Sequence, residues 1–216
     1  GFSTLNNMPI LETEDFLERA AELQAVGRFF HSRNWAPATS GNYSARVDSD
    51  NIAVTVSGAH KGELSEQEIM VVKPDGERVA SFHLGQRSSA ETLLHTSVYQ
   101  ADEGVGSVLH SHSVNSTVIS RQAGDSLVLD GYEILKAFPG INTHATRLVV
   151  PVFDNQQDIP RLVAEVDAYR SHAEIFVGYL IRGHGLYSWG RSVAEARRCI
   201  EAFEFLFECE LKTPKQ

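Results

Sequence analysis

Apolar side chains recur with a helical period at both ends of the chain. Thr13 can cap a helix that runs to about residue 32, and Ser192 with Glu195 forms a capping box that opens the last helix. The buried stripes expected for these helices are Phe16, Ala20, Leu23, Val26 and Phe30, and then Ala196, Ile200, Phe203 and Phe207. Shorter helices are predicted over residues 88–100, 113–121 and 158–169.

Short apolar runs predict strands between these helices. Residues 39–47 and 52–56 are expected to form a hairpin, and residues 69–72 and 78–82 flank a second turn. Further strands are predicted at 105–112, within 127–135, at 147–152 and at 175–181. Because hairpins occur and helices do not alternate strictly with strands, an α/β fold is predicted, with three layers (α-β-α) and a mixed, mostly antiparallel central sheet. No linker or repeat divides the chain, so a single domain is expected over residues 1–216.

The net charge bears on which partners the protein can bind, and the cysteines bear on whether it holds a disulfide. The 216 residues carry a formal net charge of −9, which argues against nonspecific binding to nucleic acid. Cys199 and Cys209 lie on the predicted last helix, roughly 15 Å apart along its axis, which is too far for a disulfide. A reduced, cytoplasmic protein without a membrane partner is expected, since the sequence contains neither a membrane-spanning stretch nor a signal peptide.

The strand at 105–112 ends in two histidines, His110 and His112. Residues two apart on a strand project from the same face, so their imidazoles can ligate one divalent metal ion. The alternative is a polar strand end with two solvated or hydrogen-bonded rings. His184 follows another apolar strand between two glycines and is a candidate third ligand. Three histidines with an open fourth position are typical of a catalytic site.

Two glutamates are candidates for acid/base chemistry beside such a metal. Glu91 follows Ser88, Ser89 and Ala90 at the start of a predicted helix, where its charge could equally serve the helix N-terminus. Glu133 lies in a mainly apolar run, and an exposed position on a short element is the alternative interpretation.

Three loops of small residues could bind a phosphate through backbone amides and hydroxyls. They are Ser40-Gly41-Asn42, Ser57-Gly58 and Ser88-Ser89, and Lys61 could add positive charge beside the second loop. Ordinary turn chemistry is the alternative explanation for each loop taken alone. The histidines at positions 31, 83, 95, 144 and 172 show no ligand spacing and are interpreted as structural or surface residues.

These motifs, in this order, resemble the class II aldolase family, whose members work on sugar phosphates. The resemblance covers nearly the whole chain. It implies one zinc ion per subunit on His110, His112 and His184, phosphate contacts from the three loops, and homotetramers with active sites near subunit interfaces. The aldolases of this family use a glutamate at the position of Glu91 as acid/base. In the dehydratases the position of Glu133 is the better candidate, and this chain has both.

Further segments resemble the dehydratases of the family more than the aldolases. They are residues 89–95, 131–136, 152–155 and 201–207. A sugar-phosphate aldolase or epimerase, of the fuculose-1-phosphate aldolase or ribulose-5-phosphate 4-epimerase type, is the nearest alternative. A non-catalytic interaction module like the adducin head is a more distant one. Residues 138–147 depart from the family pattern, which leaves the role of His144 open.

Overall fold

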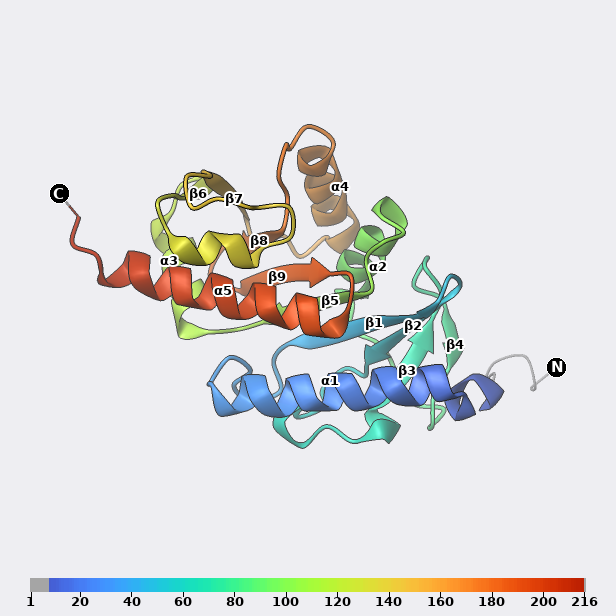
Figure 1. Ribbon diagram of the computed structural model, residues 1–216. Coiled ribbons are helices and arrows are strands. Elements are labelled where there is room, and N and C mark those ends of the chain that lie inside the picture. The colour runs from blue at the N-terminus through green and yellow to red at the C-terminus, as the bar shows by residue number, and fades with distance from the viewer. Residues whose placement is uncertain (1–7, 216) are drawn as a thin grey trace.

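The computed structural model describes residues 8–215 (Figure 1). Nine strands form one sheet in the order β4-β3-β2-β1-β5-β9-β8-β7-β6. Every neighbouring pair in this order is antiparallel except β7 and β8, which run parallel. The predicted α/β fold with a mixed, mostly antiparallel central sheet is confirmed.

The secondary structure follows the predicted order with small shifts at the boundaries. The strands are β1 (Asn42–Asp48), β2 (Asn51–Thr55), β3 (Ile69–Val72), β4 (Arg78–Ala80), β5 (Ser107–Ser111), β6 (Ser126–Leu129), β7 (Leu148–Phe153), β8 (Gly178–Ile181) and β9 (Gly185–Gly190). The α-helices are α1 (Glu14–Ser32), α2 (Thr92–Ala101), α3 (Val114–Gln122), α4 (Ile159–Arg170) and α5 (Val193–Lys212). Short 3₁₀ helices are η2 (Met8–Glu12), η3 (Lys61–Glu63), η4 (Glu66–Glu68) and η5 (Glu133–Ala137).

The structure corrects two details of the sequence analysis. Strand β9 was not predicted, although it lies near the middle of the sheet. The capping box of α5 is also modified: the Ser192 hydroxyl accepts from the Glu195 amide, but the Glu195 carboxylate accepts from the amide of Arg191 rather than from that of Ser192.

Helices cover both faces of the sheet, and neighbouring residues on one strand show how the faces differ. Tyr43 on β1 points to α1, where its ring lies 5.5 Å from that of Phe30. Ser44, the next residue, points to α2 and hydrogen-bonds with His95 at 2.7 Å. Successive side chains on a strand alternate between faces, so α1 and α2 lie on opposite sides. Helix α5 lies beside α1 and α4 lies beside α2, which gives the three layers (Figure 1).

Helix α1 is in close contact with η3 at Gly27. A Cβ atom added there would lie 2.2 Å from the backbone oxygen of Lys61. In an exposed helix, replacing glycine with alanine adds about 1 kcal/mol of stability. Here the clash should reverse that sign, and we expect Gly27→Ala to lower the free energy of unfolding by about 1–3 kcal/mol.

Urea denaturation measures this effect, and Gly124→Ala is the matched control. Nothing lies within 4 Å of a Cβ atom added at Gly124, so we expect that variant to stay within about 0.5 kcal/mol of the parent. Equal stability of the two variants would contradict the packing argument.

Among the described residues, no helix combines the length and apolarity needed to cross a membrane.

Candidate active site

The register of the sheet places four polar side chains in one row across four strands. Asn42 on β1 is opposite His110 on β5, His110 is opposite Tyr187 on β9, and Tyr187 is opposite Tyr179 on β8. Directly opposed residues share a face, and this is the face covered by α2. The rings of His110 and Tyr187 stack with their centroids 3.9 Å apart. The row fixes His110 between two polar neighbours.

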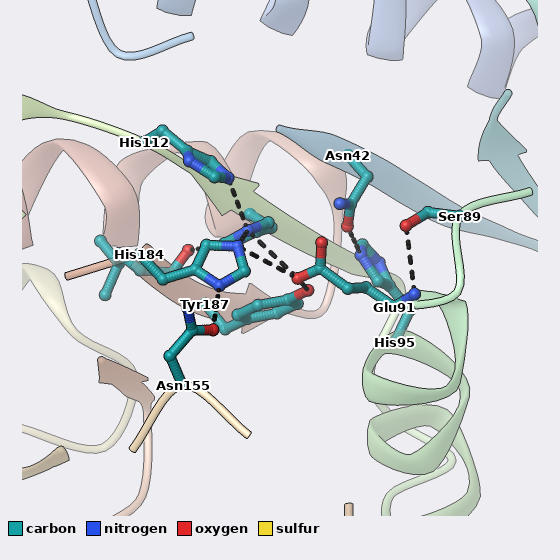
Figure 2. A network of polar contacts seen from close by, with 10 residues as sticks. Asn42, Ser89, Glu91, His95, His112, Asn155, His184 and Tyr187 are labelled. Atoms are coloured by element: carbon teal, nitrogen blue, oxygen red, sulfur yellow. Dashed lines mark hydrogen bonds and ion pairs between the residues drawn. The ribbon is translucent and has the colours of Figure 1, made fainter. Parts of the chain in front are cut away.

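The other two predicted metal ligands, His112 and His184 (Figure 2), converge on the ring of His110. The Nε2 atom of His110 lies 2.9 Å from that of His112 and 3.3 Å from that of His184. His112 directly follows β5, and His184 lies in the turn between β8 and β9. Gly185 allows this approach, because a Cβ atom there would lie 2.2 Å from the backbone oxygen of Ser111. The three side chains form a group that could hold a metal ion.

Hydrogen bonds on the other ring nitrogen prepare two of these histidines as ligands. His110 Nδ1 lies 2.9 Å from the carbonyl oxygen of Leu186, and His184 Nδ1 lies 2.9 Å from the amide oxygen of Asn155. Both partners are acceptors, so each Nδ1 carries the proton and each Nε2 presents a lone pair. Two lone pairs that face each other at 3.3 Å repel, and a cation between them would remove the repulsion.

Burial keeps the rings of His110 and His112 in the neutral form that a metal requires. It lowers the pKa of His110 well below its usual value, and His112 and His184 lower it further through their charges. Burial also lowers the pKa of His112 to about 4, helped by His184 and Lys61. A neutral imidazole offers a lone pair without first losing a proton, so both rings are ready to bind a metal at neutral pH.

Glu91 turns away from the helix that it precedes and into the histidine cluster. It occupies the N-cap position of α2, but its side chain makes no capping hydrogen bond. Its Oε1 atom accepts from the Tyr187 hydroxyl at 2.8 Å and lies 3.5 Å from Nε2 of His110 and 3.4 Å from Nε2 of His184. This carboxylate can therefore ligate a metal or act as a base beside it.

All three small-residue loops border one cavity of about 150 Å³, which also reaches Glu91 and His112. Its lining includes Ser40, Gly41, Asn42, Ser57, Gly58, Lys61 and Ser89. Ser88 is not among the lining residues and forms an isolated bridge with Val56. The structure therefore brings together every loop that the sequence suggested for phosphate binding, next to the histidine cluster.

Lys61 links two of these loops through hydrogen bonds to backbone oxygens next to each of them. Its side chain is 1% exposed, and its ammonium donates to the carbonyl oxygens of Thr39 at 3.1 Å and Ala59 at 2.6 Å. Burial lowers the pKa of Lys61 to about 8, although the charge of Glu68 opposes this shift. Lysine at this position thus loses its charge closer to neutral pH than an exposed lysine does.

This placement predicts how phosphate affinity depends on pH. We expect the affinity for inorganic phosphate to fall between about pH 7 and about pH 9, because the Lys61 ammonium loses its proton in that range. In Lys61→Met the affinity should be lower and the fall should disappear. Calorimetric titration of phosphate into both proteins measures this. The same pH dependence in both would contradict a role for the Lys61 charge.

Glu133 is not brought to the histidines within one chain. Its carboxylate is 77% exposed and pairs with Lys136, whose hydrogen bond lowers the pKa of Glu133. The segment that carries it packs against α5, with the ring of Phe138 at 4.5 Å from that of Phe203. Helix α5 covers the sheet face opposite to that of His110, so Glu133 and His110 lie in different layers.

The sequence analysis missed three side chains of the site, Tyr187, His95 and Asn155. Asn155 orients His184, and Tyr187 contacts both His110 and Glu91. His95 is fully buried and hydrogen-bonds with Asn42. One signal was available for His95, because it lies one helical turn after Glu91 on α2 and so shares a helix face with it. Tyr187 could have been recognised only if strand β9, which carries it, had been predicted.

The amino-acid sequence matches a known family. The family described as the class II aldolase and adducin N-terminal domain matches residues 21–211, and the chain belongs to it. The methylthioribulose-1-phosphate dehydratase of Marinobacter nauticus is 57% identical over 197 residues, which cover 90% of this chain and 93% of that protein. The methylthioribulose-1-phosphate dehydratase of Pseudomonas savastanoi pv. phaseolicola is 52% identical over 194 residues, covering 89% and 94%.

Solved structures share the fold at lower identity. YgbL from Klebsiella pneumoniae superposes with a TM-score of 0.77 at 21% identity, covering 93% of this chain and 92% of that chain. The L-fuculose-1-phosphate aldolase of Thermus thermophilus gives a TM-score of 0.70 at 21% identity, covering 91% and 95%. At this identity the likeness concerns the fold alone.

Proposed function

We propose that this protein is a zinc-dependent hydro-lyase of methionine salvage that converts 5-methylthioribulose 1-phosphate to 5-methylthio-2,3-diketopentyl 1-phosphate and water. The 57% identity to a methylthioribulose-1-phosphate dehydratase supports the substrate and the reaction. The observation that carries the proposal is the single cavity bordered by the small-residue loops, Glu91 and His112. Such a cavity can hold a phosphate at one end and the reacting carbons at the other.

The donor set fits zinc. His110, His112 and His184 offer three neutral nitrogens within 4.8 Å of one another, and three histidines with an open position suit a catalytic zinc ion. One ion per subunit, when bound there, supplies a Lewis acid for the carbonyl and hydroxyl oxygens of a ketose phosphate. Hydrogen bonds donated by two of the rings to the Leu186 carbonyl and the Asn155 side-chain oxygen hold these rings in the orientation that this binding needs.

Two carboxylates share the proton transfers. Glu91, next to the histidines, takes the proton from C3 of the substrate. Glu133, protonated from solvent before it acts, gives a proton to the hydroxide that leaves C4, so that water is released, and the proton that Glu91 has taken passes to solvent. The resulting enol ketonises to the 2,3-diketone, and no redox cofactor is required. The loops and Lys61 bind the phosphate and thereby fix which carbons face Glu91.

Glu133 reaches the site from a neighbouring subunit of a homotetramer. Within one chain the sheet separates it from His110, so only a second copy can bring it close. Exposed apolar side chains support contact surfaces at both places: Ile134 next to Glu133 is 36% exposed, and Val114, two residues after His112, is 64% exposed. Burying such side chains is what a stable subunit interface does.

Incubation of the zinc-loaded protein with 5-methylthioribulose 1-phosphate tests the function. We expect one equivalent of water to be lost with the carbon chain intact, detected as a diketone phosphate by mass spectrometry. Cleavage of the carbon chain or inversion of a hydroxyl would instead indicate an aldolase or an epimerase. A protein that binds no zinc and turns over none of these substrates would indicate an interaction module of the adducin-head kind.

A further inference from the structure

A chain of polar groups leads from the core to the Glu91 carboxylate, and Figure 2 shows its last members, His95, Asn42, Tyr187 and Glu91. The Tyr99 hydroxyl lies 2.8 Å from Ser44 Oγ, which lies 2.7 Å from His95 Nδ1. On the other side of the ring, His95 Nε2 hydrogen-bonds with the side-chain oxygen of Asn42. Asn42 acts on the Tyr187 hydroxyl as a side-chain donor and so opposes the burial that raises the pKa of Tyr187. The Tyr187 hydroxyl then donates to Glu91 Oε1 at 2.8 Å.

The direction of every hydrogen bond follows from the last one. A carboxylate only accepts, so Tyr187 uses its single proton on Glu91. The Tyr187 oxygen must then accept, and Asn42 must present its NH₂ group to it. That orientation turns the Asn42 oxygen to His95, which must donate from Nε2. Its Nδ1 is then unprotonated and accepts from Ser44.

We propose that His95 is a positioning residue: by donating from Nε2 to the side-chain oxygen of Asn42 it holds Asn42 with its N–H donors toward the phosphate cavity and Tyr187, which is the arrangement that the Glu91 carboxylate requires. Asn42 has two N–H groups, and the one that does not serve Tyr187 is available to a phosphate, since Asn42 lines the cavity. One buried ring thereby connects the phosphate site with the base. The inference deepens the proposed function and rests on it for the roles of Glu91 and the cavity.

The surroundings of His95 suit this role. Its side chain is fully buried, and burial lowers the pKa of His95 to about 3, so that the ring is neutral and has a single N–H. One neighbour opposes the proposed tautomer: the Val108 carbonyl accepts from the His95 ring and, at 3.3 Å, from Ser44 Oγ, so it competes for the protons of both groups. The two tautomers thus donate to different acceptors, Val108 and Asn42. The tautomer that donates to Asn42 is favoured, because the Glu91 carboxylate can only accept and so needs the proton of Tyr187.

The tautomer of His95 is directly measurable. In the zinc-loaded protein labelled with ¹⁵N-histidine, long-range proton–nitrogen correlation should find the His95 proton on Nε2. In Ser44→Ala, which removes the donor to Nδ1, the form protonated on Nδ1 should become populated. A proton on Nδ1 in the parent protein, or equal amounts of both forms, would overturn the proposal. This measurement needs no substrate, so its result is independent of whether the protein has dehydratase activity.

Kinetics give the second test. We expect His95→Phe, which has no donor for Asn42, to lower kcat/KM for 5-methylthioribulose 1-phosphate by about 10- to 100-fold, the usual size of such orienting contacts. His95→Gln keeps an N–H group and should recover most of that loss. Zinc content should not change in either variant. His83→Phe, at an exposed histidine, is the matched control and should behave as the parent. Equal loss in the Phe and Gln variants would reduce His95 to a packing residue and overturn the proposal.

Discussion

Zinc is expected to dissociate readily from a His184→Ala variant, with turnover lost at the same time. Removing an outer group that only orients a metal ligand lowers metal affinity by about 10- to 100-fold, and His184 supplies one of the three converging nitrogens itself. We therefore expect a loss greater than about 100-fold, measured by competition with a chromogenic chelator. The fold should survive, because the side chain lies in a turn and is 20% exposed.

A graded series makes this prediction sharper. Asn155→Ala removes only the acceptor that orients His184, so its zinc affinity should fall between those of the parent and of His184→Ala. His83→Ala changes an exposed histidine and should bind zinc as the parent does. Unchanged affinity in His184→Ala would remove His184 from the ligand set and leave only His110 and His112.

Glu133→Gln is expected to lower kcat by about 10²- to 10⁴-fold, the range for removal of a general acid. Zinc content and stability should be retained, because Glu133 is exposed and pairs with Lys136 at the surface of the chain. If Glu133 acts in a neighbouring subunit, two inactive variants can complement each other. Glu133→Gln and His110→Ala subunits, refolded together in equal amounts, should recover about a quarter of the parental activity from sites that receive both native residues.

Two comparisons decide between the possible outcomes. Mixing Glu133→Gln with His184→Ala should complement equally well, whereas mixing His110→Ala with His184→Ala should recover nothing, since both changes affect the same histidine cluster. Loss of turnover without complementation would mean that Glu133 acts in the active site of its own subunit. That outcome would contradict the inference that the sheet keeps Glu133 away from His110 within one chain. Near-normal turnover of Glu133→Gln alone would remove it from the mechanism.

The sequence predicted the fold well where one face of an element is buried. The stripe of α1 is one example, because its apolar residues repeat every three or four positions and all of them are buried. Strand β9 was missed for the opposite reason. It lies near the middle of the sheet with helices on both sides, and four of its first five residues are buried. A strand covered on both faces loses the alternation that identifies a strand.

In the candidate site as well, residues placed by local strand geometry were predicted and residues brought together by tertiary packing were not. His110 and His112 were predicted as neighbours because local strand geometry alone puts them on one face. The pairing of His95 with Asn42 spans 53 residues and depends on how α2 is placed against β1, which no local pattern contains. For Glu133, no local pattern shows that the chain crosses to the layer of α5 before η5.

The hydrogen bond from His110 to the Leu186 carbonyl has a consequence for how the protein acquires its metal. Leu186 belongs to β9, whose ladder with β5 holds the ring whether or not an ion is present. A zinc finger collapses when its metal is chelated, whereas this framework should outlast chelation and take up zinc again without refolding. Chelated protein should keep a cooperative melting transition, and added zinc should raise the Tm by mass action alone. The metal content would then follow the supply of ions in the cell throughout the lifetime of the protein, rather than being set when the chain folds.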